Sequence, residues 1–82
     1  MAKILFFGRL GEQFGREIDF DLPAGGCTVG ELRGLLWHHL PTEGDDLRTP
    51  RVKACVDQEI VPDAALVRAG QEIAFLPPLS GG

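Results

Sequence analysis

One amphipathic helix, expected over residues 28–40, limits the folds that this chain can adopt. Its apolar face has members at the spacing of successive helical turns: Val29, Leu32, Leu36 and Leu40. Thr28 and Glu31 have the spacing of a capping box at its start, and Pro41 ends it. Since one helix covers only one face of a sheet, the pattern predicts an α+β domain with a single main helix packed on one side.

Short segments around this helix have the patterns of β-strands. Residues 16–22 alternate polar and apolar side chains, and residues 51–56 do the same, which is typical of half-buried strands. Further strands are expected from short apolar runs beside turn residues, at 2–8, 60–61 and 72–77.

The connections between these strands are expected to be irregular. Gly8, Gly11 and Gly15 favour a flexible loop that joins the first two strands into a hairpin. Residues 62–69 are expected to be irregular and anchored by Leu66. The order of the segments predicts a mixed sheet with the first and last strands as central neighbours, as in the β-grasp or ubiquitin-like arrangement.

The composition excludes several classes of protein. A chain of 82 residues is long enough for one domain, and a net charge of −4 without a basic stripe argues against a nucleic-acid partner. Apolar stretches of about six residues are far shorter than the roughly 20 residues that cross a bilayer, so no membrane partner is expected. The N-terminus has too short an apolar run for a signal peptide, which favours a cytoplasmic location.

Side chains with catalytic or metal-binding chemistry are scarce. Soft-metal ligands could come only from Cys27, Cys55, His38 and His39. The two histidines are adjacent, so on a helix they point about 100° apart. The serine and the threonines lie outside any nucleophile motif, and the early glycines do not match a phosphate-binding loop. We therefore expect no metal and no bound cofactor.

A mismatch between apolar strands and available cover predicts a docking surface. Residues 4–7 and 73–76 are apolar on both faces of their strands. On the helix side of the sheet we place Ile4, Phe6, Ile73 and Phe75. The opposite face then carries Leu5, Phe7, Ala74 and Leu76, joined by Ile60. An exposed apolar patch of this kind usually marks a partner surface. Loops folding over the patch, or an inverted assignment of the two faces, are the alternatives.

The C-terminal sequence reads Pro77-Pro78-Leu79-Ser80-Gly81-Gly82. Two prolines favour an extended segment that leaves the sheet, so we expect a folded domain over 1–77 and an extended flexible tail over 78–82. Glycines without a Cβ suit a narrow channel. The Gly82 carboxylate is an exposed anion that adenylation by ATP would convert into an acyl donor for a sulfur or nitrogen nucleophile. A frayed terminus is the alternative.

The chain resembles the small-subunit family of molybdopterin synthase, whose members are ubiquitin-like sulfur carriers. The resemblance extends over essentially the whole length. It is strongest in residues 3–7 and 74–82 and fair in residues 56–61. The ending Phe-Leu-Pro-Pro-Leu-Ser-Gly-Gly is much more specific than Gly-Gly alone.

The resemblance implies a carrier that is not an enzyme by itself, with the catalytic residues on a large synthase subunit. An adenylyltransferase similar to ubiquitin-activating enzymes, which consumes ATP, would join AMP to Gly82. A sulfurtransferase would then convert the adenylate into a thiocarboxylate. The tail would enter the large subunit and donate sulfur to cyclic pyranopterin monophosphate, in a heterotetramer of two small and two large subunits. The implied docking residues are Phe7, Ile60 and Leu76, to which the cover argument adds Leu5.

Three other functions remain open. The first is a sulfur carrier for thiazole synthesis or tRNA thiolation, with identical chemistry at Gly82. The second is a ubiquitin-like protein modifier that is attached to lysines through Gly82. The third is a plain binding module in which the terminal Gly-Gly is incidental.

Overall fold

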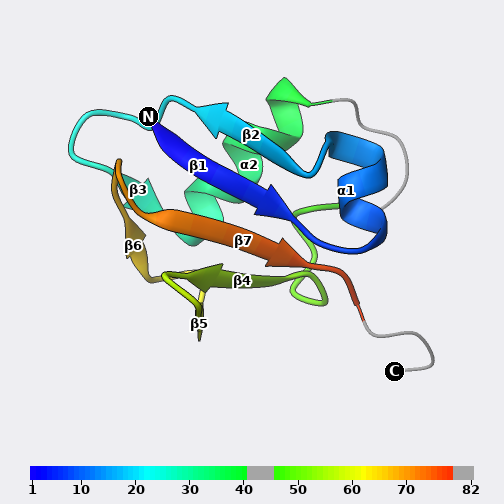
Figure 1. Ribbon diagram of the computed structural model, residues 1–82. Coiled ribbons are helices and arrows are strands. Elements are labelled where there is room, and N and C mark those ends of the chain that lie inside the picture. Colours follow the sequence, from blue (N-terminus) through cyan, green and yellow to red (C-terminus); the bar gives the residue numbers. More distant parts are fainter. Residues whose placement is uncertain (41–45, 79–82) are drawn as a thin grey trace.

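The computed structural model describes residues 1–40 and 46–78. Its elements follow in the order β1 (Ala2–Phe6), α1 (Arg9–Phe14), β2 (Glu17–Phe20), β3 (Cys27–Thr28), α2 (Val29–His39), β4 (Lys53–Val56), β5 (Glu59–Val61), β6 (Leu66–Val67) and β7 (Glu72–Leu76). The larger sheet has the strand order β2-β1-β7-β4-β5, and β3 and β6 form a separate pair. Figure 1 shows α2 crossing one face of the larger sheet and α1 at the end where β1 finishes.

The first and last strands are parallel neighbours at the centre of the sheet, as predicted. Ile4 lies opposite Ile73 and Phe6 lies opposite Phe75. All four side chains are at most 2% exposed, and the two phenylalanine rings stack with centroids 5.9 Å apart. These are the residues assigned to the helix side of the sheet, so the predicted assignment of faces is confirmed.

Helix α2 begins where the capping-box pattern predicts. The Thr28 hydroxyl accepts a hydrogen bond from the Glu31 amide at 3.1 Å, and the Glu31 carboxylate accepts one from the Thr28 amide at 2.9 Å. These bonds from Thr28, the backbone one first, hold the pKa of Glu31 below its ordinary value. The inward face is buried at Val29, Leu32 and Leu36, because its spacing follows the helical turn.

The flexible loop expected between β1 and β2 is wrong, because residues 9–14 form helix α1. Leu10 and Phe14 stand one turn apart and are both buried, with the Phe14 ring 5.3 Å from that of Phe6. Two of the glycines that favoured a loop, Gly8 and Gly15, instead flank the helix, and both have positive φ. Strands β1 and β2 do pair antiparallel, as the hairpin required, with α1 as the connection.

The prediction that residues 62–69 are irregular is also wrong in part. Leu66 and Val67 form β6, which pairs antiparallel with Cys27 and Thr28 just before α2. Val67 is fully buried, whereas Leu66, the expected anchor, is 60% exposed. Val67, which lies on the opposite face of the same short strand, is therefore the anchor.

A buried arginine on α2, which the sequence patterns did not reveal, holds two loops against the helix. Arg33 is 4% exposed. Its Nη1 donates to the carbonyl oxygens of Leu47 at 2.7 Å and Thr49 at 3.1 Å. Its Nε donates to the Asp63 carboxylate at 3.0 Å, and its guanidinium lies 5.6 Å from the Phe75 ring centroid. Arg33 thus joins both loops to the central strand.

Replacing Arg33 with methionine is expected to lower the free energy of unfolding by about 2 kcal/mol or more, because buried carbonyl oxygens lose their donor. Urea unfolding measures the effect. Arg68→Met at an exposed position is the matched control and should change stability by less than about 0.5 kcal/mol. Equal losses in the two variants would contradict the role assigned to Arg33.

Candidate functional site

The C-terminal tail leaves the sheet at the end of β7. Leu76 is the last residue of that strand and lies opposite Lys53 in β4. Pro77 has no amide hydrogen and cannot extend the ladder, so the chain turns out of the sheet there (Figure 1). Pro77 and Pro78 are half-buried. The remaining tail residues of the predicted site lie outside the described residues: Leu79, Ser80, Gly81 and Gly82.

The start of the tail packs beside the turn from β1 into α1. The Phe7 amide donates to the Phe75 carbonyl at 3.1 Å. Gly8 then adopts φ +56°, and a Cβ built there would lie 3.0 Å from Cγ of Pro77. A larger residue would meet both backbone strain and the proline ring. Gly8 therefore lets β1 turn away directly beside the point where the tail leaves.

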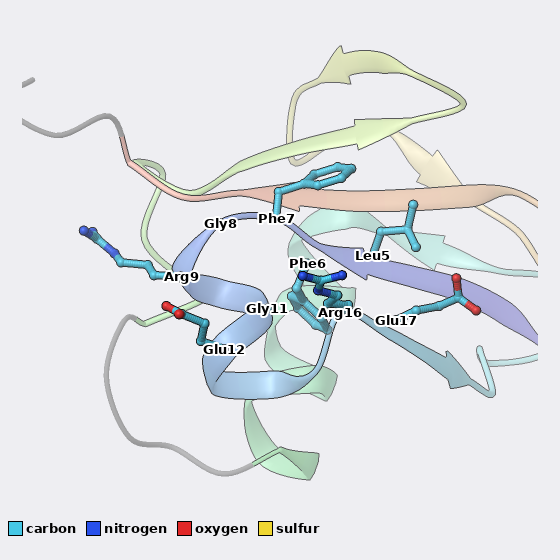
Figure 2. Close-up of a pocket in the computed structure, with 9 residues that line it drawn as sticks. All are labelled: Leu5, Phe6, Phe7, Gly8, Arg9, Gly11, Glu12, Arg16 and Glu17. Carbon is cyan, nitrogen blue, oxygen red and sulfur yellow. The ribbon is translucent and has the colours of Figure 1, made fainter.

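The predicted docking residues lie together on the sheet face opposite α2, which we call the open face. Cross-strand pairs place Leu5 beside Ala74, Ala74 beside Cys55 and Cys55 beside Ile60. Figure 2 shows Leu5 and Phe7 on one side of β1 and Phe6 on the other. The open face comprises Leu5, Phe7, Cys55, Ile60, Ala74 and Leu76.

Two side chains of the open face are strongly exposed. Ile60 is 67% exposed and Phe7 is 47% exposed, while Leu5 and Leu76 are half-buried by their strand neighbours. Ala74, small and set between longer side chains, is 4% exposed. No segment of the described chain covers Phe7 or Ile60, so loops of residues 1–40 and 46–78 do not close this face. Such a surface has the character of a docking site.

An open groove of about 890 Å³ continues the open face toward α1. Its apolar floor includes Leu5 and Phe7, and its charged walls come from α1 and the start of β2 (Figure 2). The lining residues are Leu5, Phe6, Phe7, Gly8, Arg9, Gly11, Glu12, Arg16 and Glu17.

The two cysteines occupy different environments, and both are free thiols. Cys27 is buried in β3, and burial raises the pKa of its thiol, an effect that the nearby Glu31 carboxylate reinforces. Cys55 is half-buried in the middle of the open face, between Ala74 and Ile60. A high thiol pKa disfavours the nucleophilic thiolate, so Cys27 is a packing residue.

The other candidates from the sequence are dispersed. His38 is exposed, and His39 packs edge-on against Phe20 with ring centroids 5.5 Å apart. Within residues 1–40 and 46–78, no three His, Cys, Asp or Glu side chains come close enough to hold a metal ion. In the same part of the chain no helix has the length and apolar character to span a bilayer.

Comparison with known proteins identifies similar chains over the whole length. Residues 4–82 match the model of the ThiS family. The chain is 30% identical, over 86 aligned positions that cover both proteins fully, to the molybdopterin synthase sulfur carrier subunit of Haemophilus influenzae.

Solved structures confirm the predicted ubiquitin-like β-grasp fold. SAMP1 from Haloferax volcanii is 28% identical, with a TM-score of 0.70 and coverage of 99% of this chain and 98% of that one. A chain from the complex of subunits 1 and 2 of molybdopterin-converting factor from Helicobacter pylori is 21% identical, with a TM-score of 0.66. That match covers 99% of this chain and 97% of the other.

Alkylation by iodoacetamide is expected to modify Cys55 much faster than Cys27, since Cys27 is buried and its pKa is raised. Mass spectrometry of digested protein at successive times measures both rates. Denatured protein is the control, in which the two rates should converge. Faster modification of Cys27 in the folded protein would contradict the described burial of β3.

Proposed function

The chain belongs to the ThiS family, and from this membership we propose that it is a sulfur carrier, the small subunit of a molybdopterin synthase. The H. influenzae relative has that role by name and matches the chain over its full length. The proposal depends mainly on one observation: the family model matches the chain as far as residue 82, so the match includes Gly81 and Gly82.

The proposed reagent is the Gly82 carboxylate. A carboxylate is a poor acyl donor, so an adenylyltransferase first joins it to the α-phosphate of ATP and releases pyrophosphate. A sulfurtransferase system then supplies the sulfur nucleophile, which displaces AMP and leaves a thiocarboxylate on Gly82. The thiocarboxylate sulfur attacks cyclic pyranopterin monophosphate, and water then cleaves the bond between the acyl carbon and sulfur, which leaves sulfur on the pterin and regenerates the carboxylate.

The proposed docking site of the large subunit is the open face, with Leu5, Phe7, Ile60 and Leu76 as its contacts. Leu76 is both a member of this face and the last strand residue before the tail. A partner that covers the face is therefore placed to receive the segment that begins at Pro77. In support, the H. pylori chain of the same fold is described as part of a complex of subunits 1 and 2.

In this proposal the chain itself performs no catalysis. The large subunit supplies the residues that bind the pterin and move protons, in an assembly of two small and two large subunits. ATP is consumed by the adenylyltransferase, so the carrier needs no bound cofactor. The H. influenzae relative is named as the sulfur carrier subunit of a synthase, which supports this division.

A protein modifier is the second candidate function, favoured by the likeness to SAMP1. A related H. volcanii structure of the same fold is called small archaeal modifier protein 1. In that function an amine of a target lysine replaces the sulfur nucleophile at Gly82. Trypsin cleaves after Arg68, the last basic residue, so a modified target would carry residues 69–82 on a lysine. A carrier for thiazole or tRNA thiolation shares the chemistry and is distinguished by the partner that co-purifies.

Deletion of Gly82 is expected to abolish molybdopterin formation, because it removes the residue that bears the reacting carbonyl and shortens the tail by one residue. The folded domain should be unaffected, with a midpoint of thermal unfolding within about 1 °C of the wild type, since the tail follows the last strand. Reconstitution with the large subunit and a thiocarboxylated carrier measures the transfer. Wild-type transfer by the shortened chain would contradict the mechanism.

Phe7→Asp is expected to weaken binding to the large subunit by tenfold or more, because a charge replaces an exposed apolar contact of the proposed interface. Calorimetric titration measures affinity, and thermal unfolding measures stability. Leu66→Asp is the matched control, since Leu66 is 60% exposed and lies on β6, outside the open face. Equal affinities for the two variants would contradict the assignment of the interface.

A further inference from the structure

The chain contains two lysines, Lys3 and Lys53, and six arginines. Both lysines are exposed on the same side of the sheet as the open face. Lys3 stands two residues before Leu5 on β1, and Lys53 lies opposite Leu76. Arginine is protonated at physiological pH and is not a nucleophile, so both side-chain amines of the protein lie on the side of the sheet that carries its proposed docking surface.

The two amines differ in their surroundings. Lys3 lies between two acidic cross-strand neighbours, Asp19 on β2 and Glu72 on β7. Its Nζ is also 3.8 Å from the carboxylate of Glu17. Three carboxylates around one amine repel an acyl adenylate, because the phosphate of that intermediate is an anion.

Lys53 stands in a more accessible and less acidic position. Its cross-strand neighbour on β7 is the apolar Leu76. On its other side, β5 pairs with residues 54–56 of β4 and does not extend beside Lys53. Within the described part of the chain its ammonium forms no ion pair. An anionic acyl group can therefore approach this amine without meeting a paired carboxylate.

We propose that Lys53 is an acceptor site for the activated C-terminus of a second copy of this chain, and that the amide formed there blocks docking on the open face. The inference rests on the proposed adenylation of Gly82. The lone pair of the deprotonated amine attacks the acyl carbon of the adenylate. A C–N bond forms, the C–O bond to AMP breaks, and the amine proton passes to water, so the products are an amide and AMP.

Docking and conjugation then exclude each other. A whole second chain attached beside Leu76 occupies the space that the large subunit needs. Conversely, docking prevents conjugation, because a docked partner covers both lysines. The α-amine of Met1 is then the one amine that remains accessible. Met1 is 71% exposed at the start of β1, and Figure 1 places that end of the strand away from the point where the tail leaves. Docking therefore protects the carrier from being consumed by a second activated carrier.

The first test is to incubate the full chain with the adenylyltransferase of the same cell and magnesium ATP, without a sulfur donor. Trypsin digestion and mass spectrometry should find residues 69–82 of one copy joined to Lys53 of another. Lys53→Arg, which keeps the charge, should remove at least nine-tenths of the conjugate, and Lys3→Arg should leave it unchanged. Conjugates mainly at Lys3 or Met1 would overturn the proposal.

Exchange of pyrophosphate into ATP is measured in the same reaction to separate two kinds of failure. Exchange without any conjugate at Lys53 would overturn this inference and leave the sulfur-carrier function standing. A wild-type chain that supports no exchange would contradict the adenylation of Gly82 itself, and this inference would fail with it.

The second test compares two purified conjugates in titrations with the large subunit. The conjugate at Lys53 should bind at least tenfold more weakly than the free chain. The matched control is a Lys3→Arg, Lys53→Arg, Arg68→Lys variant, whose conjugate forms at position 68, outside the open face, and should bind like the same variant before conjugation. Equal affinities for the two conjugates would overturn the claim that acylation at Lys53 blocks docking.

Discussion

The parallel pairing of β1 with β7 is the interaction on which the rest of the structure depends. It joins the two ends of the chain at the centre of the sheet and buries Ile4, Phe6, Ile73 and Phe75 beneath α2. Because side chains alternate along a strand, the same pairing sets Leu5 and Leu76 on the opposite face. It also fixes where the tail leaves, since β7 ends beside the turn at the end of β1.

In the proposed function, recognition and chemistry belong to different parts of the chain. The folded domain offers an exposed apolar face and an open groove, and its buried thiol has a raised pKa. The proposed reaction uses a backbone carboxylate, which acquires reactivity only through other proteins. The further proposal adds that an activated terminus would react with amines, and that both lysines lie on the side of the sheet where the partner is proposed to dock.

The sequence predicted the elements whose patterns are local. The capping box at Thr28 and the alternation in β4 are such patterns, and both are confirmed. Helix α1 was missed because glycines suggested a loop, although Leu10 and Phe14 had the spacing of one helical face. The β3–β6 pair and the buried Arg33 depend on contacts between distant residues, which no local pattern encodes. The open face could be predicted because two neighbouring strands are apolar on both sides. Its role in docking and the chemistry of Gly82 remain predictions.

The central claim is that the last carboxylate of the chain is the sulfur-bearing group. Intact-mass spectrometry of the carrier purified from its native cell tests this most directly. We predict a species in which one oxygen is replaced by sulfur, with fragment ions that place the sulfur on Gly82, and its loss on incubation with the large subunit and cyclic pyranopterin monophosphate. Sulfur located on Cys55 or Cys27 instead, with an unmodified terminus, would contradict the account.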